Sequence, residues 1–210
     1  DSEDGRQALK QLAATSDILI ETSAPGSMDN RGVGYAALRE INPRLIYLSL
    51  TPFGLDGPHS GYKAIDLHVQ AMGGMMTIQG DDERAPCMAP AQQGYQMGSL
   101  HAAMGAMLAV IAREKTGRGQ FVEVSMQEVI ANTFFQVVRY SALGEIESRP
   151  GRGTNLPMVG IFQARDGGWI NMTPLTPGHI ESAFEWIADA RFAGPEWRER
   201  EYRQANAEVL

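Results

Sequence analysis

The residues that could do chemistry gather around the start of a long helix built largely from small side chains. Between Gly94 and Lys115 glycines and alanines mark one predicted helix face, which includes Gly98 and Gly105. Each glycine costs a helix about 1 kcal/mol relative to alanine, so a close contact must compensate. That contact is tight packing against another element, or a thioester or carboxylate held by the unpaired amides and the dipole at the helix start. Both can hold at once, and Tyr95 lies at that start.

The other titratable side chains form no metal-binding pattern. The acidic run Asp81, Asp82 and Glu83 follows a glycine, which is typical of a solvated turn, although a nucleophile there is an alternative. The four histidines, at positions 59, 68, 101 and 179, have no metal-ligand spacing. A single cysteine, Cys87, excludes an internal disulfide and a multi-cysteine metal site. We therefore expect no metal, and the single cysteine fits a cytoplasmic location.

The elements that must position these residues alternate between helices and short apolar strands. A helical period over residues 6–15 is followed by a short strand, Ile18–Glu21. A helix over 35–40 ends before Pro43, and a second strand follows at Leu45–Leu50. A strand, a helix and a strand within about 30 residues are typical of a parallel sheet. We expect an α/β fold in which these two strands are neighbours, flanked by helices.

The pattern changes beyond residue 125. A helix is predicted over 127–143, followed by a loop rich in glycine, proline and arginine over 144–160 and two short strands around the turn at 166–168. Such loops connect domains. We therefore predict a large α/β domain over residues 1–144, and a linker with the beginning of a smaller second domain over 145–210.

Composition limits the possible partners. With 210 residues and 43% apolar content, the chain can bury a sizeable core. Its net charge of −7, without a basic run, argues against nucleic acid as a partner. The longest apolar run, residues 102–112, is 11 residues long, whereas a membrane span needs roughly 20. We expect neither nucleic acid nor a membrane as a partner.

Several motifs in sequence order resemble one known family. The small-residue helix ends in Thr116-Gly-Arg-Gly-Gln120 and is followed by Phe121-Val-Glu-Val-Ser125. Upstream stand a strand with the loop Ala24-Pro-Gly-Ser-Met28, and the segment Asn42-Pro-Arg-Leu-Ile-Tyr47. Together with Asp66 and the following Gln-Ala-Met-Gly-Gly, this order resembles the family III CoA-transferases, also called the CaiB/BaiF family.

The resemblance implies a fold, an activity and an assembly. It implies transfer of CoA between carboxylic acids by way of an acyl-CoA thioester, and CoA or acyl-CoA as the substrate. Members form interlocked dimers of ring-like monomers, which here would be a homodimer or a heteromer with a second member. The first strand of a member is missing from the start of this sequence, which is read as an internal fragment of about half a family member.

The same resemblance puts the catalytic residue in question. The family's nucleophilic aspartate stands 21 positions before the residue that matches Thr116, which in this sequence is Tyr95. An aspartate is ionised at neutral pH, whereas phenols ionise only near pH 10, so tyrosine is a poor replacement. We expect Tyr95 to fill the vacated space or to donate a hydrogen bond to a thioester carbonyl. The racemase branch is excluded, since its histidine and aspartate positions hold Ile65 and Tyr95.

The resemblance also implies the residues that bind CoA. The loop after the first strand grips the adenosine part of CoA in the family. Carried over residue by residue, the CoA-binding candidates are Ser23, Ala24, Pro25, Gly26, Met28, Arg31, Lys63 and Asp66. The family's Asn-Phe-Arg is replaced here by Thr22-Ser23-Ala24, so its aromatic platform for adenine is absent.

Two classes of function follow. The chain is a CoA-transferase, or it is a catalytically silent subunit or half of a heteromeric CoA-transferase that shapes a dimer and holds part of the CoA site. A second family member with an aspartate at the Tyr95 position, encoded by a neighbouring gene, would favour the silent subunit.

Overall fold

A computed structural model describes residues 2–81, 83–133, 140, 142–144, 158–206 and 209. The chain divides into two compact units: Asp1–Thr77 with Met88–Glu147, and Ile78–Cys87 with Ser148–Leu210. The domain boundary expected between residues 144 and 145 stays a prediction.

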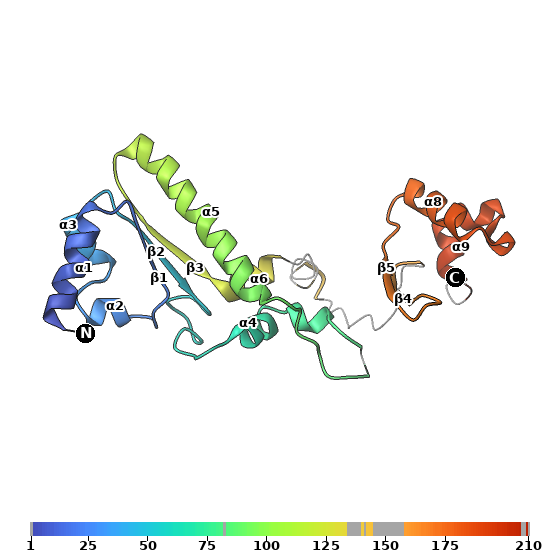
Figure 1. The fold of residues 1–210 in the computed structure, drawn as a ribbon, viewed down its shortest axis with the longest axis horizontal. Helices are drawn as coiled ribbons and strands as arrows, with labels where there is room; N and C mark the ends of the chain where they lie inside the picture. Colours follow the sequence, from blue (N-terminus) through green and yellow to red (C-terminus); the bar gives the residue numbers. More distant parts are fainter. Residues whose placement is uncertain are drawn as a thin grey trace. The chain divides into compact units, whose positions relative to one another are not determined.

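The first unit is built on a three-stranded parallel sheet (Figure 1). Its strands are β1 (Ile18–Glu21), β2 (Ile46–Thr51) and β3 (Phe121–Ser125), in the order β1-β2-β3. Ile18 pairs with Ile46, and Tyr47 pairs with Phe121. The α/β fold and the pairing of the first two predicted strands are therefore confirmed, with β2 beginning one residue later than expected.

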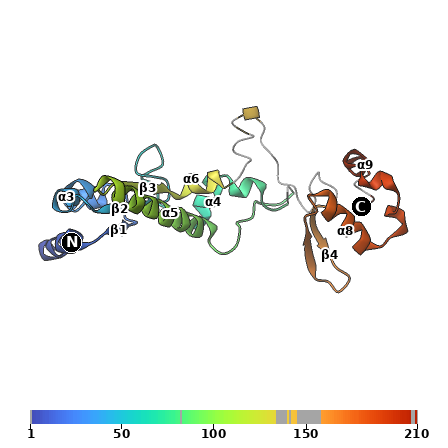
Figure 2. The same cartoon turned by 90° about the horizontal axis from the view of Figure 1, so that it is seen from above.

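Helices cover both faces of this sheet, as the two views in Figures 1 and 2 show. One face packs against α1 (Glu3–Thr15) and α3 (Tyr35–Ile41) through a core that includes Ala13, Leu38 and Tyr47. The other face packs against a larger core that includes Leu48, Val69 and Ile130. The elements on that side are α4 (Asp66–Met72), the short 3-10 helix η1 (Met75–Ile78), α5 (Gln93–Thr116) and α6 (Met126–Asn132). The short helix α2 (Ser27–Asn30) follows β1.

The small residues of α5 allow it to approach its neighbours closely. A Cβ atom on Gly98 would lie 2.9 Å from Cγ of Met126, and one on Gly105 would lie 3.0 Å from Cγ1 of Val122. Ala102, Ala106 and Ala109 are buried along the same face. The close-packing explanation of these small residues is therefore confirmed.

The opposite face of α5 is apolar and exposed. The exposed fraction is at least 46% for each of five large side chains along it: Leu100, Met104, Met107, Leu108 and Ile111. We call this set the α5 stripe.

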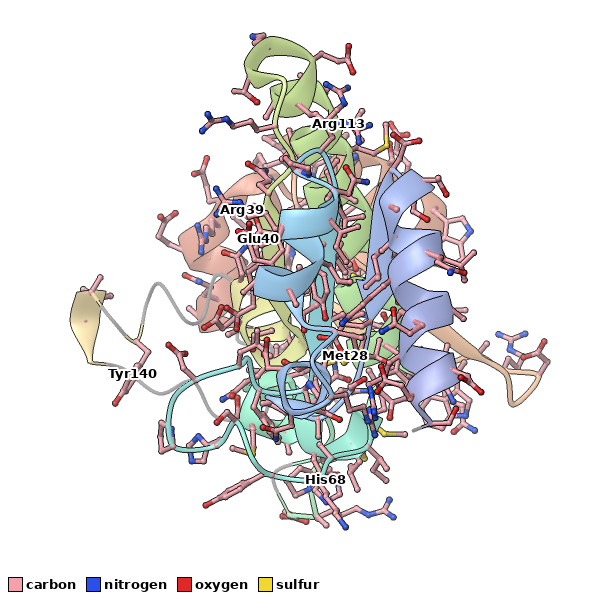
Figure 3. All side chains as sticks on the ribbon, turned by 90° about the vertical axis from the view of Figure 1, so that its left-hand side faces the viewer. Met28, Arg39, Glu40, His68, Arg113 and Tyr140 are labelled. Carbon is pink, nitrogen blue, oxygen red and sulfur yellow. The ribbon has the colours of Figure 1, made fainter. Side chains whose placement is uncertain are left out.

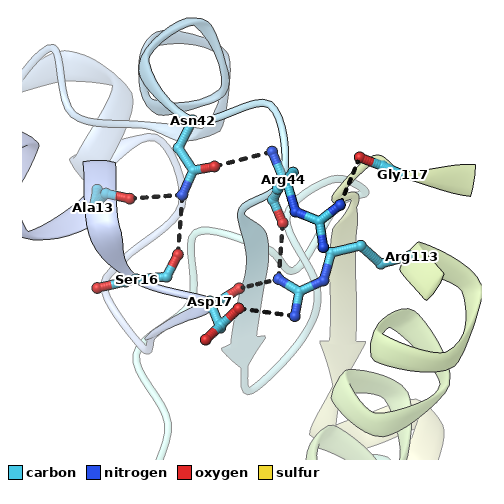
Figure 4. A network of polar contacts seen from close by, with 7 residues as sticks. All are labelled: Ala13, Ser16, Asp17, Asn42, Arg44, Arg113 and Gly117. Carbon is cyan, nitrogen blue, oxygen red and sulfur yellow. Dashed lines mark hydrogen bonds and ion pairs between the residues drawn. The ribbon is translucent and has the colours of Figure 1, made fainter.

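A polar clasp ties the amino ends of the strands to the C-terminal end of α5 (Figure 4). Arg113, 6% exposed, donates hydrogen bonds to the carbonyl oxygens of Asp17 and Arg44 and forms an ion pair of 2.9 Å with Asp17. The Asn42 side chain donates to the carbonyl oxygens of Ala13 and Ser16. In Figure 3, Arg113 lies in the upper part of the view, and Met28 lies below the middle.

The second unit contains an antiparallel hairpin and several short helices. The hairpin consists of β4 (Gly160–Gln163) and β5 (Trp169–Met172), which confirms the two strands predicted around the turn at 166–168. The helices are α8 (Pro177–Ile187), the 3-10 helices η2 (Ala190–Phe192) and η3 (Pro195–Arg198), and α9 (Arg200–Ala205). Their core includes Phe184, Phe192 and Trp197.

One sequence expectation is met only in part within the described ranges. The helix predicted over 127–143 corresponds to α6, which ends at Asn132; residues 134–139 and 141 lie outside the described residues. Among the residues that the structure describes, no helix has both the length and the apolarity to cross a membrane.

Candidate functional site

Tyr95 lies in the first turn of α5, where helix amides lack partners within the helix. Its backbone N–H donates to Oδ1 of Asp66 over 3.1 Å, and its partly buried ring packs against the core shared by β2, α4 and α6. Gln92, immediately before α5, has a left-handed backbone and caps no amide with its side chain. A carboxylate from another helix therefore caps the start of α5 at Tyr95, the residue that the sequence analysis aligned with the family's nucleophile.

Asp66 is held between two partners. Its carboxylate is 6% exposed, and Oδ2 accepts a hydrogen bond of 2.6 Å from Nε2 of Gln70. A Cβ atom on Gly94 would lie 2.8 Å from Oδ1 of Asp66 and 3.0 Å from Cγ1 of Val69. Glycine at position 94 therefore lets α4 and its carboxylate reach the first turn of α5.

Gln70 extends this contact to the loop that leads into α5. It is fully buried, and its Oε1 accepts from the N–H of Ala89 over 2.9 Å while its Nε2 donates to the carbonyl oxygen of Ala89 over 3.2 Å. Asp66, Gln70 and the backbone of Ala89 and Tyr95 form a closed hydrogen-bonded set, which we call the Asp66 brace. The sequence analysis missed Gln70, whose only signal is an amide side chain within a helix that must be buried.

The loop after β1 turns sharply and forms the second part of the site. Gly26 has φ +74°, a conformation that favours glycine, and it precedes α2. Glu21 ends β1, and its carboxylate accepts hydrogen bonds from the N–H of Ser23 over 2.7 Å and from Oγ of Ser49 over 2.5 Å. The loop is thus fixed to the carboxyl ends of β1 and β2.

A pocket of about 450 Å³ opens beside this loop. We call it the β1–β2 pocket. It takes in three of the predicted CoA-binding residues and is lined by Glu21, Ala24, Gly26, Met28, Asp29, Tyr35, Ala36, Tyr47, Leu55 and Phe121.

Aromatic rings and carboxylates dominate this pocket. Tyr35, Tyr47 and Phe121 pack with ring centroids 5.3–5.8 Å apart. Burial raises the pKa of Tyr47 well above its usual value, and the negative charges of Glu21 and Asp29 raise it further. None of the described lining residues carries a positive charge. The sequence analysis missed Glu21 and Tyr47 because each belongs to an apolar strand pattern.

The remaining predicted residues lie apart from the pocket lining. Lys63 is exposed in the loop before α4, and Arg31 is an exposed residue at the end of α2. His68 accepts a hydrogen bond from the N–H of Ile65 through Nδ1, and Nδ1 of His101 lies 2.9 Å from the carbonyl oxygen of Met97. Asp82 lies outside the described residues.

The structure also bears on a metal site. In the described ranges, no three His, Cys, Asp or Glu side chains stand together as a metal ion would require.

In open parallel α/β sheets, ligands bind at the edge formed by the carboxyl ends of the strands. The start of α5 lies beside that edge in this chain, which places the fold in this class of α/β proteins. Residues 1–210 match the family described as CoA-transferase family III, and the chain belongs to that family.

Known proteins resemble the chain in both sequence and structure. It is 40% identical over 131 residues to a formyl-CoA:oxalate CoA-transferase from Streptomyces avermitilis, covering 62% of this chain and 32% of that protein. It is 34% identical over 165 residues to a subunit of succinyl-CoA:(R)-benzylsuccinate CoA-transferase from Thauera aromatica, covering 79% of this chain and 40% of that subunit. The chain superposes on a crystal structure of a CaiB/BaiF family protein from Brucella suis with a TM-score of 0.82 and 27% identity. The superposition covers all of this chain and 56% of that protein. The chain thus spans less than half the length of these two curated relatives.

Proposed function

We propose that the chain takes part in the transfer of CoA between carboxylic acids by way of an acyl-CoA thioester. The observation that carries this proposal is the family match over all 210 residues. The similar proteins from Streptomyces avermitilis and Thauera aromatica are named as CoA-transferases, one of them as a subunit.

Tyr95, in the first turn of α5, favours the alternative in which this chain is a catalytically silent subunit. Alignment with the family motif predicts that Tyr95 stands at the nucleophile position. The partly buried Tyr95 ring packs against the core, which fits a side chain that fills space. A chain of this kind would shape an assembly in which a second family member, with an aspartate at the equivalent position, forms the acyl intermediate.

Trapping of the covalent intermediate tests this proposal. The whole protein that contains this chain is incubated with an acyl-CoA, treated with hydroxylamine or borohydride, and analysed by mass spectrometry. We expect no adduct at Tyr95, and we expect Tyr95→Asp to gain CoA transfer, since it restores a carboxylate that the helix dipole helps keep ionised. Tyr95→Phe, which removes only the hydroxyl, is the matched control and should behave like the native protein.

Two results would contradict the silent-subunit form. CoA transfer by the native protein alone, with an adduct at Asp81, Asp82 or Glu83, would mean that the alignment has slipped across the loop before α5. An adduct at Tyr95 itself would make the phenol the nucleophile.

For CoA binding, we propose that the loop of Ser23, Ala24, Pro25, Gly26 and Met28 holds the adenosine end. Arg31 and Lys63 then supply positive charge for the phosphates from outside the pocket. Asp66 enters this proposal indirectly, because both of its carboxylate oxygens already accept hydrogen bonds within the Asp66 brace. It would support the site by fixing the start of α5.

We propose that the protein is cytoplasmic and works as an interlocked homodimer or as a heteromer with a second family member. The α5 stripe supports the assembly, since large exposed apolar patches mark missing partners. Light scattering on the isolated 210 residues should show association, and Leu108→Glu, in the middle of the stripe, should reduce it. A stable monomer at high concentration would argue against an assembly through this face.

A further inference from the structure

The loop between β2 and α4 is attached to the rest of its unit by a single polar contact. The backbone N–H of Leu55 donates to Oε1 of Glu123, on β3, over 2.7 Å. Within the described part of the chain, no other hydrogen bond or ion pair joins residues 54–63 to another element. The amides of Ser60 and Tyr62 donate to carbonyl oxygens of the loop itself. Glu123 therefore fixes the position of the first part of this loop.

Glycine at position 54 permits this contact. Gly54 has φ +83°, a left-handed conformation that favours glycine. A Cβ atom there would lie 3.2 Å from Oε1 of Glu123 and 3.7 Å from Cβ of Ser125. The chain thus passes close to β3 at Gly54, and the next N–H meets the Glu123 carboxylate.

Glu123 lies on the face of the sheet that carries the β1–β2 pocket. Phe121 and its register partner Tyr47 both line this pocket. Residues two apart in a strand point to the same face, so Glu123 shares the face of Phe121. Leu55 lines the pocket as well. The hydrogen bond between Glu123 and Leu55 therefore joins this face of the sheet to a wall of the pocket.

We propose that Glu123 is a positioning residue for CoA binding: its carboxylate holds the loop after β2 so that Leu55 closes one wall of the β1–β2 pocket. This inference rests on the proposed function, in which residues 23–28, some of which line the same pocket, hold the adenosine end of CoA. Glu123 itself is not among the lining residues, so it acts through Leu55 and not by contact with the ligand.

Loop position and CoA binding are then coupled in both directions. If the contact between Glu123 and Leu55 strengthens CoA binding by some factor, bound CoA strengthens the contact by the same factor. One charge-assisted hydrogen bond in a solvent-accessible place corresponds to a factor of about three to ten.

The first experiment measures this coupling on the unaltered protein. The whole protein that contains this chain is exchanged into heavy water with and without saturating CoA, and amide exchange is read residue by residue by mass spectrometry. We expect CoA to slow exchange at the Leu55 amide about three- to tenfold. The amides of Ser60 and Tyr62, whose acceptors lie within the loop, are the internal reference and should change little.

The second experiment assigns the effect to the hydrogen bond, with CoA affinity measured by isothermal titration calorimetry. Glu123→Ala removes the acceptor and should weaken CoA binding about three- to tenfold. Glu123→Gln keeps an acceptor oxygen without the charge and should lose only about twofold. Glu114→Ala removes an exposed carboxylate near the end of α5 and should leave CoA affinity unchanged.

Several results would overturn the proposal. Unchanged exchange at Leu55 in the CoA-bound native protein would do so, even if Glu123→Ala fails to fold. Equal losses in Glu123→Ala and Glu114→Ala would show that Glu123 has no special role, and equal losses in Glu123→Ala and Glu123→Gln would show that charge acts instead of the hydrogen bond. If the unaltered protein binds no CoA, the proposed CoA binding itself fails, and this inference fails with it.

Discussion

The Asp66 brace and the β1–β2 pocket are two polar regions of the same unit that differ in how far the fold satisfies them. In the brace, each oxygen of Asp66 and each polar atom of the Gln70 amide has a protein partner within hydrogen-bonding distance. In the pocket, the Tyr47 hydroxyl has none in the described ranges, and Asp29 is exposed to solvent.

The difference separates positioning from binding. A buried network whose members satisfy one another is rigid, and the loss of one member leaves the others unpaired. The polar groups of a pocket that opens to solvent can exchange water for a ligand. The brace therefore fixes the first turn of α5, whereas the pocket retains capacity for a further molecule.

The largest effect should come from opening the brace at Gln70. Gln70→Ala leaves the Asp66 carboxylate with one partner and removes both hydrogen bonds to Ala89 in a fully buried place. We expect the free energy of unfolding to fall by about 3 kcal/mol, from the unpaired polar groups and the cavity. Urea denaturation measures it, with exposed Gln11→Ala on α1 as the matched control, expected within about 0.5 kcal/mol of the native protein. A similar small change for both variants would show that the brace does not hold α5.

A smaller loss is expected at Gly94, where the brace meets α5. Alanine raises helix propensity by about 1 kcal/mol, but its Cβ would lie 2.8 Å from the Asp66 carboxylate and 3.0 Å from buried Val69. Because Asp66 is held by hydrogen bonds, the clash should dominate and Gly94→Ala should lose about 1–3 kcal/mol.

The control for Gly94→Ala is Gly178→Ala in α8, where a Cβ would meet no atom within 4 Å. It should be neutral or stabilising by up to about 1 kcal/mol, measured by the same denaturation. A gain of stability in both variants would mean that α4 can move away from α5 at little cost.

The sequence predicts the elements of this unit better than its polar contacts. Apolar runs bounded by polar residues locate β1 and β2, and the small-residue face of α5 forecasts its close packing, because these signals are periodic and local. The spacing from Thr116 puts Tyr95 near the helix start, where the structure has it.

The polar contacts join residues distant in the chain, so no local pattern announces them. Gln70 and Ala89 are 19 residues apart, Asp66 and Tyr95 are 29 apart, and Arg113 reaches Asp17 across 96. Tyr47 looks like one more apolar residue of a buried strand. Its place in a pocket depends on the conformation of the loop around Gly26, which sequence alone does not give.

The smallest effect concerns the pocket and follows from the raised pKa of Tyr47. Its folded pKa lies above the unfolded value of about 10. Below pH 10 the phenol is protonated in both states, and this contribution to stability is fully present. Above pH 10 the unfolded chain releases this proton and the folded chain keeps it, so the free energy of unfolding falls by up to about 1.4 kcal/mol per pH unit.

Tyr47→Phe lacks this proton, so its stability relative to the native protein should rise between pH 9.5 and 11. At pH 8 the free energies of unfolding of the two proteins should differ by less than about 1 kcal/mol, because the hydroxyl has no hydrogen-bond partner to lose in the described ranges. Urea denaturation across this range measures the difference, in which the other titrating groups cancel. Parallel pH profiles for the two proteins would show that neither burial nor the two carboxylates act on this hydroxyl, and the contrast between the brace and the pocket would not hold.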